Sequence, residues 1–330
     1  MTVVAVTGLT GFVGRNVARA LGSEGTAWRG LVRDQRKLAA LDLPKGEIVE
    51  GSLEDTAALD RLCEGASAVI HCGGRIAALS RKDFFTTNVA GTSLLLAAST
   101  RMGVKRFVHV SSLAAREPQV SDYAASKRAG EEAVKEGAGS TSWVIMRPPV
   151  VYGPGDAATV PLMRSLARPI AFVPGSAATR LSLIHVRDLA RALTMLAANH
   201  DLESTVLEID DGKAGGYNFE EIAAAASQAT GAKTRVVFVP RPMLAGPAWL
   251  SLAMARATGT PAMFCPDKLG ELYHGDWVVR SDKREFAGWQ PQIDFSTGFA
   301  DTLKWYKEHG WLPEGTGNTG RSRQEGAVCP

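Results

Sequence analysis

The sequence predicts an α/β fold built on a doubly wound parallel sheet, with a smaller substrate lobe contributed by the C-terminal half. Two observations carry this prediction. Apolar, strand-like runs alternate with helix-like stretches through the first half of the chain, and a glycine-rich turn follows the first of these runs. Such alternation is typical of parallel strands joined by crossover helices. At 330 residues the chain is long enough for one large domain and a smaller lobe.

The predicted elements follow one another in regular order through the first half of the chain. The apolar runs that predict strands are residues 3–6, 26–32, 47–49, 68–71, 107–111 and 143–146. Helix-like stretches lie between them, such as 15–21, 84–101 and 122–134. We therefore expect a dinucleotide-binding domain at residues 1–150.

After residue 150 glycine and proline interrupt this rhythm, although one further strand of the main sheet is expected to return from this part. Residues 220–230 and 296–309 predict helices, and 233–239 a strand. We expect residues 151–312 to form mainly the substrate lobe. The glycine-rich, polar residues 313–330 predict a disordered tail.

The glycine-rich turn lies between the first strand and a helix. Gly8, Gly11 and Gly14 are spaced three residues apart in TGLTGFVG. Glycine permits the sharp bend, the close approach to a pyrophosphate and the tight packing of helix on strand, while the helix N-terminus offers free N–H groups to phosphates. A glycine triplet also occurs in ordinary turns, but its place between strand and helix favours dinucleotide binding.

Tyr123 and Lys127 stand four residues apart in YAASK on a predicted helix, so both side chains lie on one face. A lysine ammonium beside a phenol is expected to lower the tyrosine pKa toward the range of a general acid or base. The pair alone also occurs by chance. Upstream, a predicted strand ends at Ser111 and Ser112, where an open parallel sheet places its ligand contacts. Serine, tyrosine and lysine in this order predict one catalytic site.

Together these motifs resemble those of the extended short-chain dehydrogenase/reductase family, which also contains nucleotide-sugar epimerases and dehydratases. The resemblance spans residues 3–311 and is carried by TGLTGFVG (7–14), VIHCGG (69–74), NVAGT (88–92), FVHVSS (107–112), YAASK (123–127), RPPVVYGPG (147–155) and LIHVRDLARA (183–192). It implies a Rossmann-type fold, with Tyr123 as the catalytic acid/base and Lys127 lowering its pKa and bonding the nicotinamide ribose. Ser112 is implied to position the substrate oxygen, with Ser111 as the less favoured alternative.

The resemblance also implies which residues bind the cofactor. They are Gly8, Thr10, Gly11, Phe12, Val13, Gly14, Arg33, Ser52, Leu53, Cys72, Gly73, Gly74, Asn88, Lys127, Pro149 and Val150. Ser52 stands where the family often has an aspartate that contacts adenine, and Cys72 is interpreted as a small packed residue. Arg75 and Arg180 join Ser112 and Tyr123 as candidate substrate-binding residues. An ion pair between Arg180 and Asp188 is the alternative.

Two residues at the end of the second strand favour different cofactors. At this place an acid bonds the 2′-hydroxyl of NAD, whereas an arginine takes the 2′-phosphate of NADP. Asp34 lies about 20 residues past the glycine loop, the spacing of an NAD-selecting acid. Arg33 is the first polar residue after the apolar run, and Arg36 and Lys37 are close by. The positive charge favours NADP, with NAD as the alternative.

Two kinds of chemistry use the same three side chains. In a ketoreductase, hydride passes from NADPH to a carbonyl carbon while Tyr123 protonates the oxygen. In an epimerase or dehydratase, tightly bound NAD is reduced and re-oxidised within one turnover, and the second lobe holds a nucleotide diphosphate. The apolar segment 242–264 favours the ketoreductase, and GWQP at 288–291 resembles the steroid-dehydrogenase and dihydroflavonol-reductase branches. The expected substrate is a lipid-like ketone: a 3-oxo lipid or oxo-sphingolipid, a sterol or a flavonoid. The intact Ser-Tyr-Lys set argues against a third interpretation, a non-catalytic NADP sensor.

Composition narrows the expected class. A hydrophobic content of 45% and a charged content of 22% are those of a soluble globular protein, and a net charge of +3 with no basic run speaks against nucleic acid as a partner. Four cysteines without CxxC spacing and scattered histidines predict a reducing cytoplasm and no metal site. The first strand begins too early to leave room for a signal peptide.

An uncharged stretch at 242–255 bears on membrane contact. It is shorter than the roughly 20 residues that a membrane-spanning helix needs. It predicts either a packed helix of the smaller lobe, or a lid or interfacial helix on a lipid surface. Peripheral contact with a membrane surface and a homodimer are both compatible with the sequence.

Overall fold

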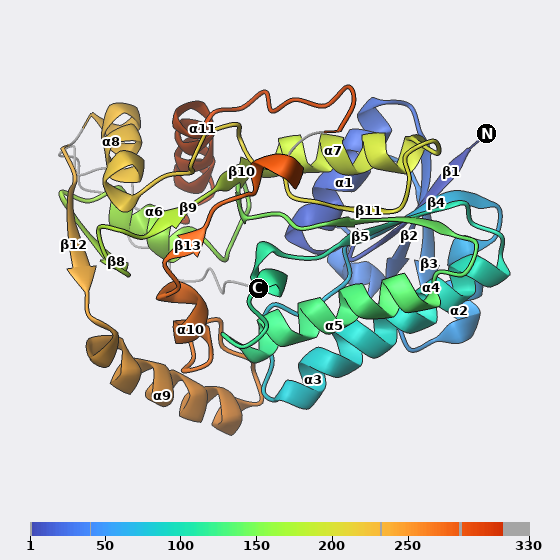
Figure 1. Cartoon of the computed structure of the whole chain (residues 1–330), viewed down its shortest axis with the longest axis horizontal. Helices are drawn as coiled ribbons and strands as arrows, with labels where there is room; N and C mark the ends of the chain where they lie inside the picture. The colour runs from blue at the N-terminus through green and yellow to red at the C-terminus, as the bar shows by residue number, and fades with distance from the viewer. Residues whose placement is uncertain (1, 40, 232, 284–285, 313–330) are drawn as a thin grey trace.

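A computed structural model of the chain describes residues 2–39, 41–231, 233–283 and 286–312. Seven parallel strands form the central sheet (Figure 1). From edge to edge they are β11 (Thr205–Leu207), β6 (Ser142–Met146), β5 (Arg106–Val110), β4 (Ala66–His71), β1 (Val3–Thr7), β2 (Ala27–Val32) and β3 (Glu47–Glu50). The strand order reverses between β1 and β4, and ligands of doubly wound sheets bind beyond the carboxyl ends of the strands at this point. The predicted fold class is confirmed.

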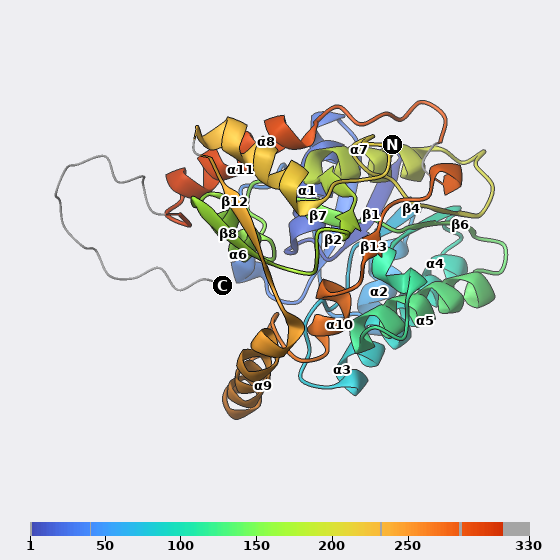
Figure 2. The same ribbon diagram turned by 60° about the vertical axis from the view of Figure 1, so that its left-hand side comes forward.

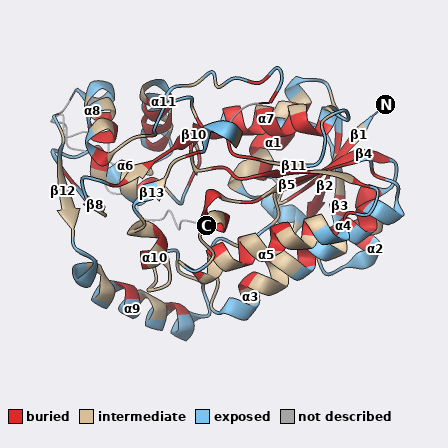
Figure 3. Ribbon diagram, viewed as in Figure 1, coloured by how far each residue is buried: buried red, intermediate tan, exposed pale blue. Residues whose placement is uncertain are grey.

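Helices cover both faces of this sheet (Figure 1). On one face lie α1 (Phe12–Ser23) and α7 (Val186–Ala198), and on the other α2 (Thr56–Cys63), α4 (Gly91–Arg101) and α5 (Asp122–Gly137). Because both faces are covered, the central strands are apolar almost throughout, and Val4, Ala5 and Val6 of β1 are all buried. Figure 3 shows this buried layer along the sheet and the inner faces of the helices.

The helical stretch predicted at 84–101 is interrupted. A π-helical turn, η2 (Thr86–Ala90), separates α3 (Arg81–Phe85) from α4. Such turns occur mostly as single insertions at functional sites. This one carries Asn88 against the loop that follows β4.

The residues after 150 build a second core beside the sheet. Short parallel strand pairs are β7 (Val150–Tyr152) with β10 (Leu183–His185), β8 (Ile170–Pro174) with β12 (Arg235–Val239), and β9 (Arg180–Leu181) with β13 (Asp276–Trp277). They pack with α6 (Val160–Leu166), α8 (Phe219–Thr230) and α11 (Phe295–Glu308) around an aromatic cluster that includes Tyr152, Phe299 and Tyr306. The last strand of the main sheet, β11, also comes from this half of the chain. The tail predicted at 313–330 lies outside the described residues.

One helix stands at the edge of the molecule. Figures 1 and 2 show α9 (Arg241–Thr258) projecting away from the sheet, followed by the short α10 (Lys268–Leu272). The inner side of α9 buries only small side chains, Ala248 and Ala255. Four of its large apolar residues are 60–67% exposed, namely Met243, Trp249, Leu250 and Met254, whereas Leu244 and Leu252 are half-buried. The interpretation of 242–255 as a packed core helix is therefore wrong. Among the described residues, no helix combines the length and the apolar character needed to cross a membrane.

Candidate active site

The glycine loop leaves room for backbone only. Gly8 has a φ of +70°, and a Cβ there would lie 2.5 Å from the carbonyl oxygen of Cys72. A Cβ on Gly14 would lie 2.2 Å from the carbonyl oxygen of Gly8. Gly11 is the N-cap residue of α1, and no described side chain caps this helix end. The N–H groups of its first turn and the positive end of its dipole are therefore available to an anion such as a pyrophosphate.

A first cavity of about 530 Å³ lies beyond the carboxyl ends of β1, β2, β3 and β4. The predicted cofactor residues that line it are Gly8, Thr10, Gly11, Arg33, Ser52, Leu53, Cys72, Gly73 and Gly74, and Arg75, predicted as a substrate residue, lines it too. The remaining lining residues, which the sequence interpretation missed, are Thr7, Leu9, Leu31, Val32, Gly51, Glu54, Thr86 and Thr87. Most of these end a strand or follow one, and that position could have indicated them.

Arg33 and Asp34 differ in their surroundings. Arg33 is exposed and lines the first cavity, whereas Asp34 does not. The Asp34 carboxylate accepts hydrogen bonds from the Arg36 guanidinium at 2.9 and 3.1 Å and from the Arg36 amide at 3.1 Å. These bonds hold the pKa of Asp34 below its usual value. The side chain that faces the cavity is thus the cation.

Other predicted cofactor residues lie outside the first cavity. Those that line neither cavity are Phe12, Val13, Gly14, Asn88 and Lys127. Asn88 is buried and holds the loop after β4 in place: its Oδ1 accepts from the amide of Arg75 at 2.7 Å, and its Nδ2 donates to the Arg75 carbonyl at 3.0 Å and to Ser126 at 2.9 Å. Asn88 thus fixes the cavity wall to α5.

A second cavity of about 240 Å³ holds the catalytic candidates Ser112 and Tyr123 together with Pro149 and Val150. Its apolar wall also includes Ile76, Leu113, Ala114, Pro148, Val151, Ala158 and Met263. The polar residues that the sequence interpretation missed are Thr159, Lys268 and Glu271, with Trp277 beside them. Arg75 lines the first cavity and Ile76 the second, so the two cavities are neighbours.

Tyr123 lies in a strongly desolvated environment. Burial raises the pKa of Tyr123 to about 12, while a hydrogen bond with Ser112 lowers it and the charge of Glu271 raises it. The Lys127 ammonium donates to the carbonyl of Val110 at 2.7 Å. Burial lowers the pKa of Lys127 to about 8, against the opposing influence of Glu131 and Cys72. The expected lowering of the Tyr123 pKa by Lys127 is therefore not what the structure shows, because burial is the largest influence on this pKa and Lys127 is not among the groups that shift it.

Ser111 and Ser112 point to different places. Ser112 lines the second cavity and caps the short helix after it by accepting from the amide of Ala114 at 3.2 Å. Ser111 is buried and donates to Glu131 at 2.5 Å. Of the two, only Ser112 lies where it could meet a substrate oxygen.

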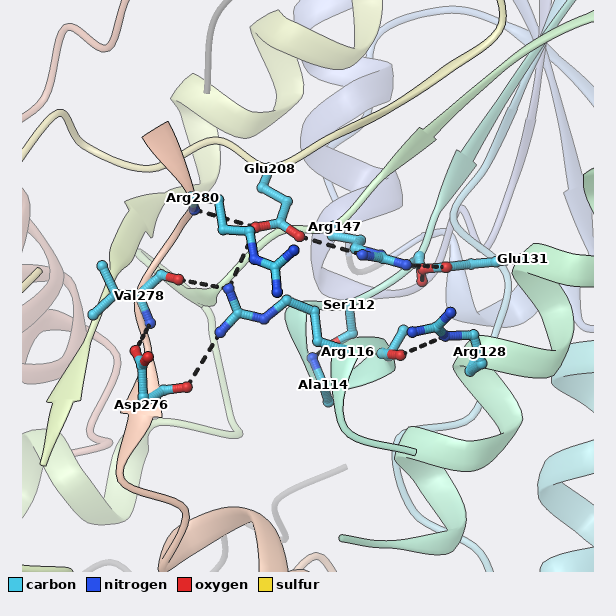
Figure 4. Close-up of polar contacts among 12 residues, drawn as sticks. Ser112, Ala114, Arg116, Arg128, Glu131, Arg147, Glu208, Asp276, Val278 and Arg280 are labelled. Carbon is cyan, nitrogen blue, oxygen red and sulfur yellow. Dashed lines mark hydrogen bonds and ion pairs between the residues drawn. The ribbon is translucent and has the colours of Figure 1, made fainter. Parts of the chain in front are cut away.

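Glu131 belongs to a set of buried charged residues that are linked by ion pairs close to Ser112 (Figure 4). Arg147 donates to Glu131 at 2.8 and 2.6 Å and to Glu208 at 3.3 Å. Arg116 reaches Glu208 at 3.5 Å and donates to the carbonyl of Val278 at 2.7 Å. The chain of contacts joins α5, the ends of β6 and β11 and the segment before residue 281. The sequence does not indicate these ion pairs, because the residues that form them are far apart along the chain.

Arg180 lies outside both cavities. It donates to the carbonyls of Gly215 at 2.6 Å and Gly216 at 3.0 Å, and pairs with Glu221 at 3.4 Å. Asp188 pairs instead with Arg191 at 2.9 Å. The alternative of an Arg180–Asp188 ion pair is therefore wrong, and the described contacts of Arg180 hold a loop.

Cys72 lines the first cavity and is partly buried. Burial raises the pKa of its thiol to about 12, so the thiol stays protonated at neutral pH. Among the described residues, no group of three or more histidine, cysteine, aspartate or glutamate side chains is placed to hold a metal ion.

Comparisons with known proteins show the family to which the chain belongs. The family described as "NAD dependent epimerase/dehydratase family" matches residues 4–209. The chain is 40% identical over 313 residues to ceramide reductase of Caulobacter vibrioides, covering 94% of this chain and 96% of that protein. It is 26% identical to sterol demethylase protein B of Methylococcus capsulatus, covering 93% and 99%. The structure of MoeE5 in complex with UDP-glucose and NAD has a similar fold, with a TM-score of 0.69, 21% identity and coverage of 94% and 99%. The chain thus belongs to the NAD-dependent epimerase/dehydratase family and is an NAD(P)-dependent oxidoreductase of the extended short-chain dehydrogenase/reductase type.

Proposed function

We propose that the protein reduces a ketone on a bulky, lipid-like substrate with NADPH, and that Tyr123 supplies the proton. The observation that carries this proposal is the second cavity, where the hydroxyls of Ser112 and Tyr123 meet an otherwise largely apolar wall beside the cofactor cavity. A pocket for a sugar diphosphate would need several cations, and Lys268 is the single Lys or Arg among the described residues that line this one. Two relatives carry the names of lipids, ceramide and sterol.

The first cavity fits an NADP(H) molecule. The glycine loop excludes side chains, the N-terminus of α1 is open to a pyrophosphate, and Arg33 faces the cavity where a 2′-phosphate would need a cation. Ser52 and Leu53 would contact the adenine, as the sequence predicts. When bound, NADPH supplies the hydride that adds to the carbonyl carbon.

The side chains of the second cavity orient the carbonyl oxygen and transfer a proton to it. Ser112 donates a hydrogen bond to the carbonyl oxygen and so orients it toward Tyr123. The Tyr123 phenol, which keeps its proton at neutral pH because its pKa is about 12, transfers that proton to the oxygen as the C–H bond forms and the C=O π bond breaks. The Lys127 ammonium stabilises the phenolate that remains, and the phenolate regains a proton from solvent.

The size of the second cavity limits which part of the substrate it holds. Its volume of about 240 Å³ lies below the roughly 300–1,000 Å³ of typical small-molecule sites. Only the part of the substrate around the ketone would fit. The hydrocarbon would leave past Ile76 and Met263, which line the cavity and are 54% and 40% exposed. Each CH₂ that this apolar surface removes from water contributes about 0.8 kcal/mol.

We also propose that α9 rests on a lipid surface. Met243, Leu250 and Met254 recur at helical spacing on its outer face, with Trp249 beside them. Residues 241–266 carry Arg241 and Arg256 and no acidic residue, which suits an anionic lipid surface. The same segment leads to Met263 at the mouth of the second cavity, so a lipid could enter without crossing water. A homodimer and a cytoplasmic location stay predictions of the sequence.

The test of the reductase proposal is turnover of defined substrates. With NADPH, the purified protein should reduce a long-chain ketone, and Tyr123→Phe should lower the rate by about 10²-fold or more while NADPH affinity stays the same. Tyr273→Phe is the matched control, because the Tyr273 hydroxyl donates to the carbonyl of Val239 and its ring lines neither cavity. Full activity of Tyr123→Phe would refute the mechanism. Co-purified stoichiometric NAD, with turnover of UDP-glucose and of no ketone, would favour an epimerase instead.

A further inference from the structure

The short helix α10 is fastened to the start of the helix that carries Tyr123. Ser121 donates to Glu271 at 2.7 Å, and the amide of Asp122 donates to Asp267 at 3.0 and 3.1 Å. A Cβ on Gly270 would lie 1.9 Å from the carbonyl oxygen of Val120, so only glycine permits this approach. These contacts therefore hold α10 against the start of α5, next to Tyr123.

This arrangement brings a cation over the catalytic phenol. The Lys268 ammonium lies 5.2 Å from the centre of the Tyr123 ring and 2.5 Å from the Glu271 carboxylate. Both Lys268 and Glu271 line the second cavity, and their side chains are 25% and 10% exposed. An ammonium has three N–H donors, and Glu271 takes one of them.

A substrate of hydrocarbon alone would fit this pair poorly. Covering the remaining Lys268 donors with CH₂ groups would remove their water without replacing its hydrogen bonds, which is unfavourable. A substrate that carries a hydrogen-bond acceptor near its ketone would replace that water. Glu271 has lone pairs left to accept from an N–H or O–H of the same group.

We propose that Lys268, positioned by Glu271, binds a polar group that the substrate carries close to its ketone, either an amide or a hydroxyl. The proposal rests on the proposed reductase function and narrows its substrate class. The preferred substrates are long-chain ketones in which the reacting carbonyl is flanked by such a group, and plain long-chain ketones are poorer. Lys268 is thus a residue that determines specificity, and Glu271 a positioning residue.

The test compares two ketones of equal chain length, one with a neighbouring N-acyl group and one without. Wild-type protein with NADPH should show a kcat/KM that is about 10-fold or more higher for the N-acyl ketone, the range expected for a hydrogen bond to a charged group. Lys268→Met should abolish this preference, because KM should rise by a larger factor for the N-acyl ketone than for the plain ketone. Lys268→Arg should restore part of it. Lys304→Met is the control, since Lys304 is 75% exposed on α11.

Four results would overturn the proposal. The first is an equal preference in wild type and Lys268→Met, and the second is an equal loss for both ketones, which would indicate a structural role only. If Lys268→Met does not fold, Lys268→Ala provides the same comparison, because it also removes the ammonium and its N–H donors. The third is a wild-type protein that reduces neither ketone but turns over UDP-glucose, which would refute the reductase function and the subsite with it. The fourth is reduction of both ketones at equal rates by wild-type protein, which would refute the subsite alone.

Discussion

Arg147 donates two hydrogen bonds to the carboxylate of Glu131, at 2.8 and 2.6 Å, and neither side chain is more than 9% exposed. Glu131 also accepts from Ser111 and lies one helical turn beyond Lys127, whose pKa its charge raises. A single buried ion pair therefore supports both the core beneath the site and the charge of the catalytic lysine.

Removing Arg147 should be costly for the fold. Arg147→Met would leave Glu131 and Glu208 buried without their shared cation, and the free energy of unfolding should fall by about 3–5 kcal/mol. Urea denaturation followed by circular dichroism measures this loss. Lys304→Met is the control, because it breaks an exposed pair with Glu308 at 3.9 Å and should cost less than about 0.5 kcal/mol. Similar losses in the two variants would show that the buried pair contributes little.

The rate of reduction should fall at alkaline pH. Burial lowers the pKa of Lys127 to about 8, so its ammonium is present below that pH and is lost above it. Tyr123, with a pKa of about 12, keeps its proton throughout this range. We expect kcat/KM to be level near neutral pH and to fall about 10-fold per pH unit well above 8, because the neutral amine no longer stabilises the phenolate.

The measurement is a pH profile of ketone reduction at saturating NADPH, with unfolding monitored in parallel. Lys127→Arg, whose guanidinium stays charged, should lose the alkaline limb in whatever activity it retains. A wild-type profile that stays level from about pH 7 to 10 would contradict the assignment.

Cofactor choice should depend on Arg33. Arg33→Ala should weaken NADPH binding by about 10-fold or more and leave NADH binding unchanged, because only NADPH carries the 2′-phosphate. Arg36→Ala is the matched control: Arg36 pairs with Asp34 and does not line the first cavity. Fluorescence titration of NADPH and NADH against the wild-type protein and both variants measures these affinities. Tighter binding of NADH by wild type, or equal effects of the two substitutions, would contradict a preference for NADP.

The parts of the site that local sequence determines could be predicted. The glycine loop, the strand ends and the Tyr123–Lys127 pair depend on spacing within a few residues. The structure places the loop and the strand ends at the first cavity and both Tyr123 and Lys127 on α5, although Lys127 lines neither cavity. The helix predicted at 122–134 is observed as α5 (Asp122–Gly137), and the strand predicted at 233–239 as β12 (Arg235–Val239).

The parts that depend on contacts between distant residues could not be predicted. Lys268 reaches Tyr123 from more than a hundred residues away, through a close approach that depends on Gly270. Arg147 and Glu208 look like ordinary surface charges in the sequence, but their burial depends on strand packing. The orientation of α9 was also out of reach, since an apolar helix can turn its large residues inward or outward with the same composition.

The outer face of α9 should bind lipid vesicles. Vesicles that contain an anionic lipid should sediment the wild-type protein, because Met243, Leu250 and Met254 can enter the acyl boundary while Arg241 and Arg256 face the headgroups. A Leu250→Ser, Met254→Ser double variant should lose most of this binding and keep its reduction of a detergent-dispersed ketone. Added salt should weaken vesicle binding without abolishing it, since only the electrostatic part of the interaction is screened.

Met102→Ser is the control for this prediction. Met102 is an exposed apolar residue at the end of α4, and its substitution should not affect sedimentation. The contrary result is a wild-type protein that fails to bind vesicles and forms a dimer that the double variant does not form. That result would show that a second copy of the chain covers this face.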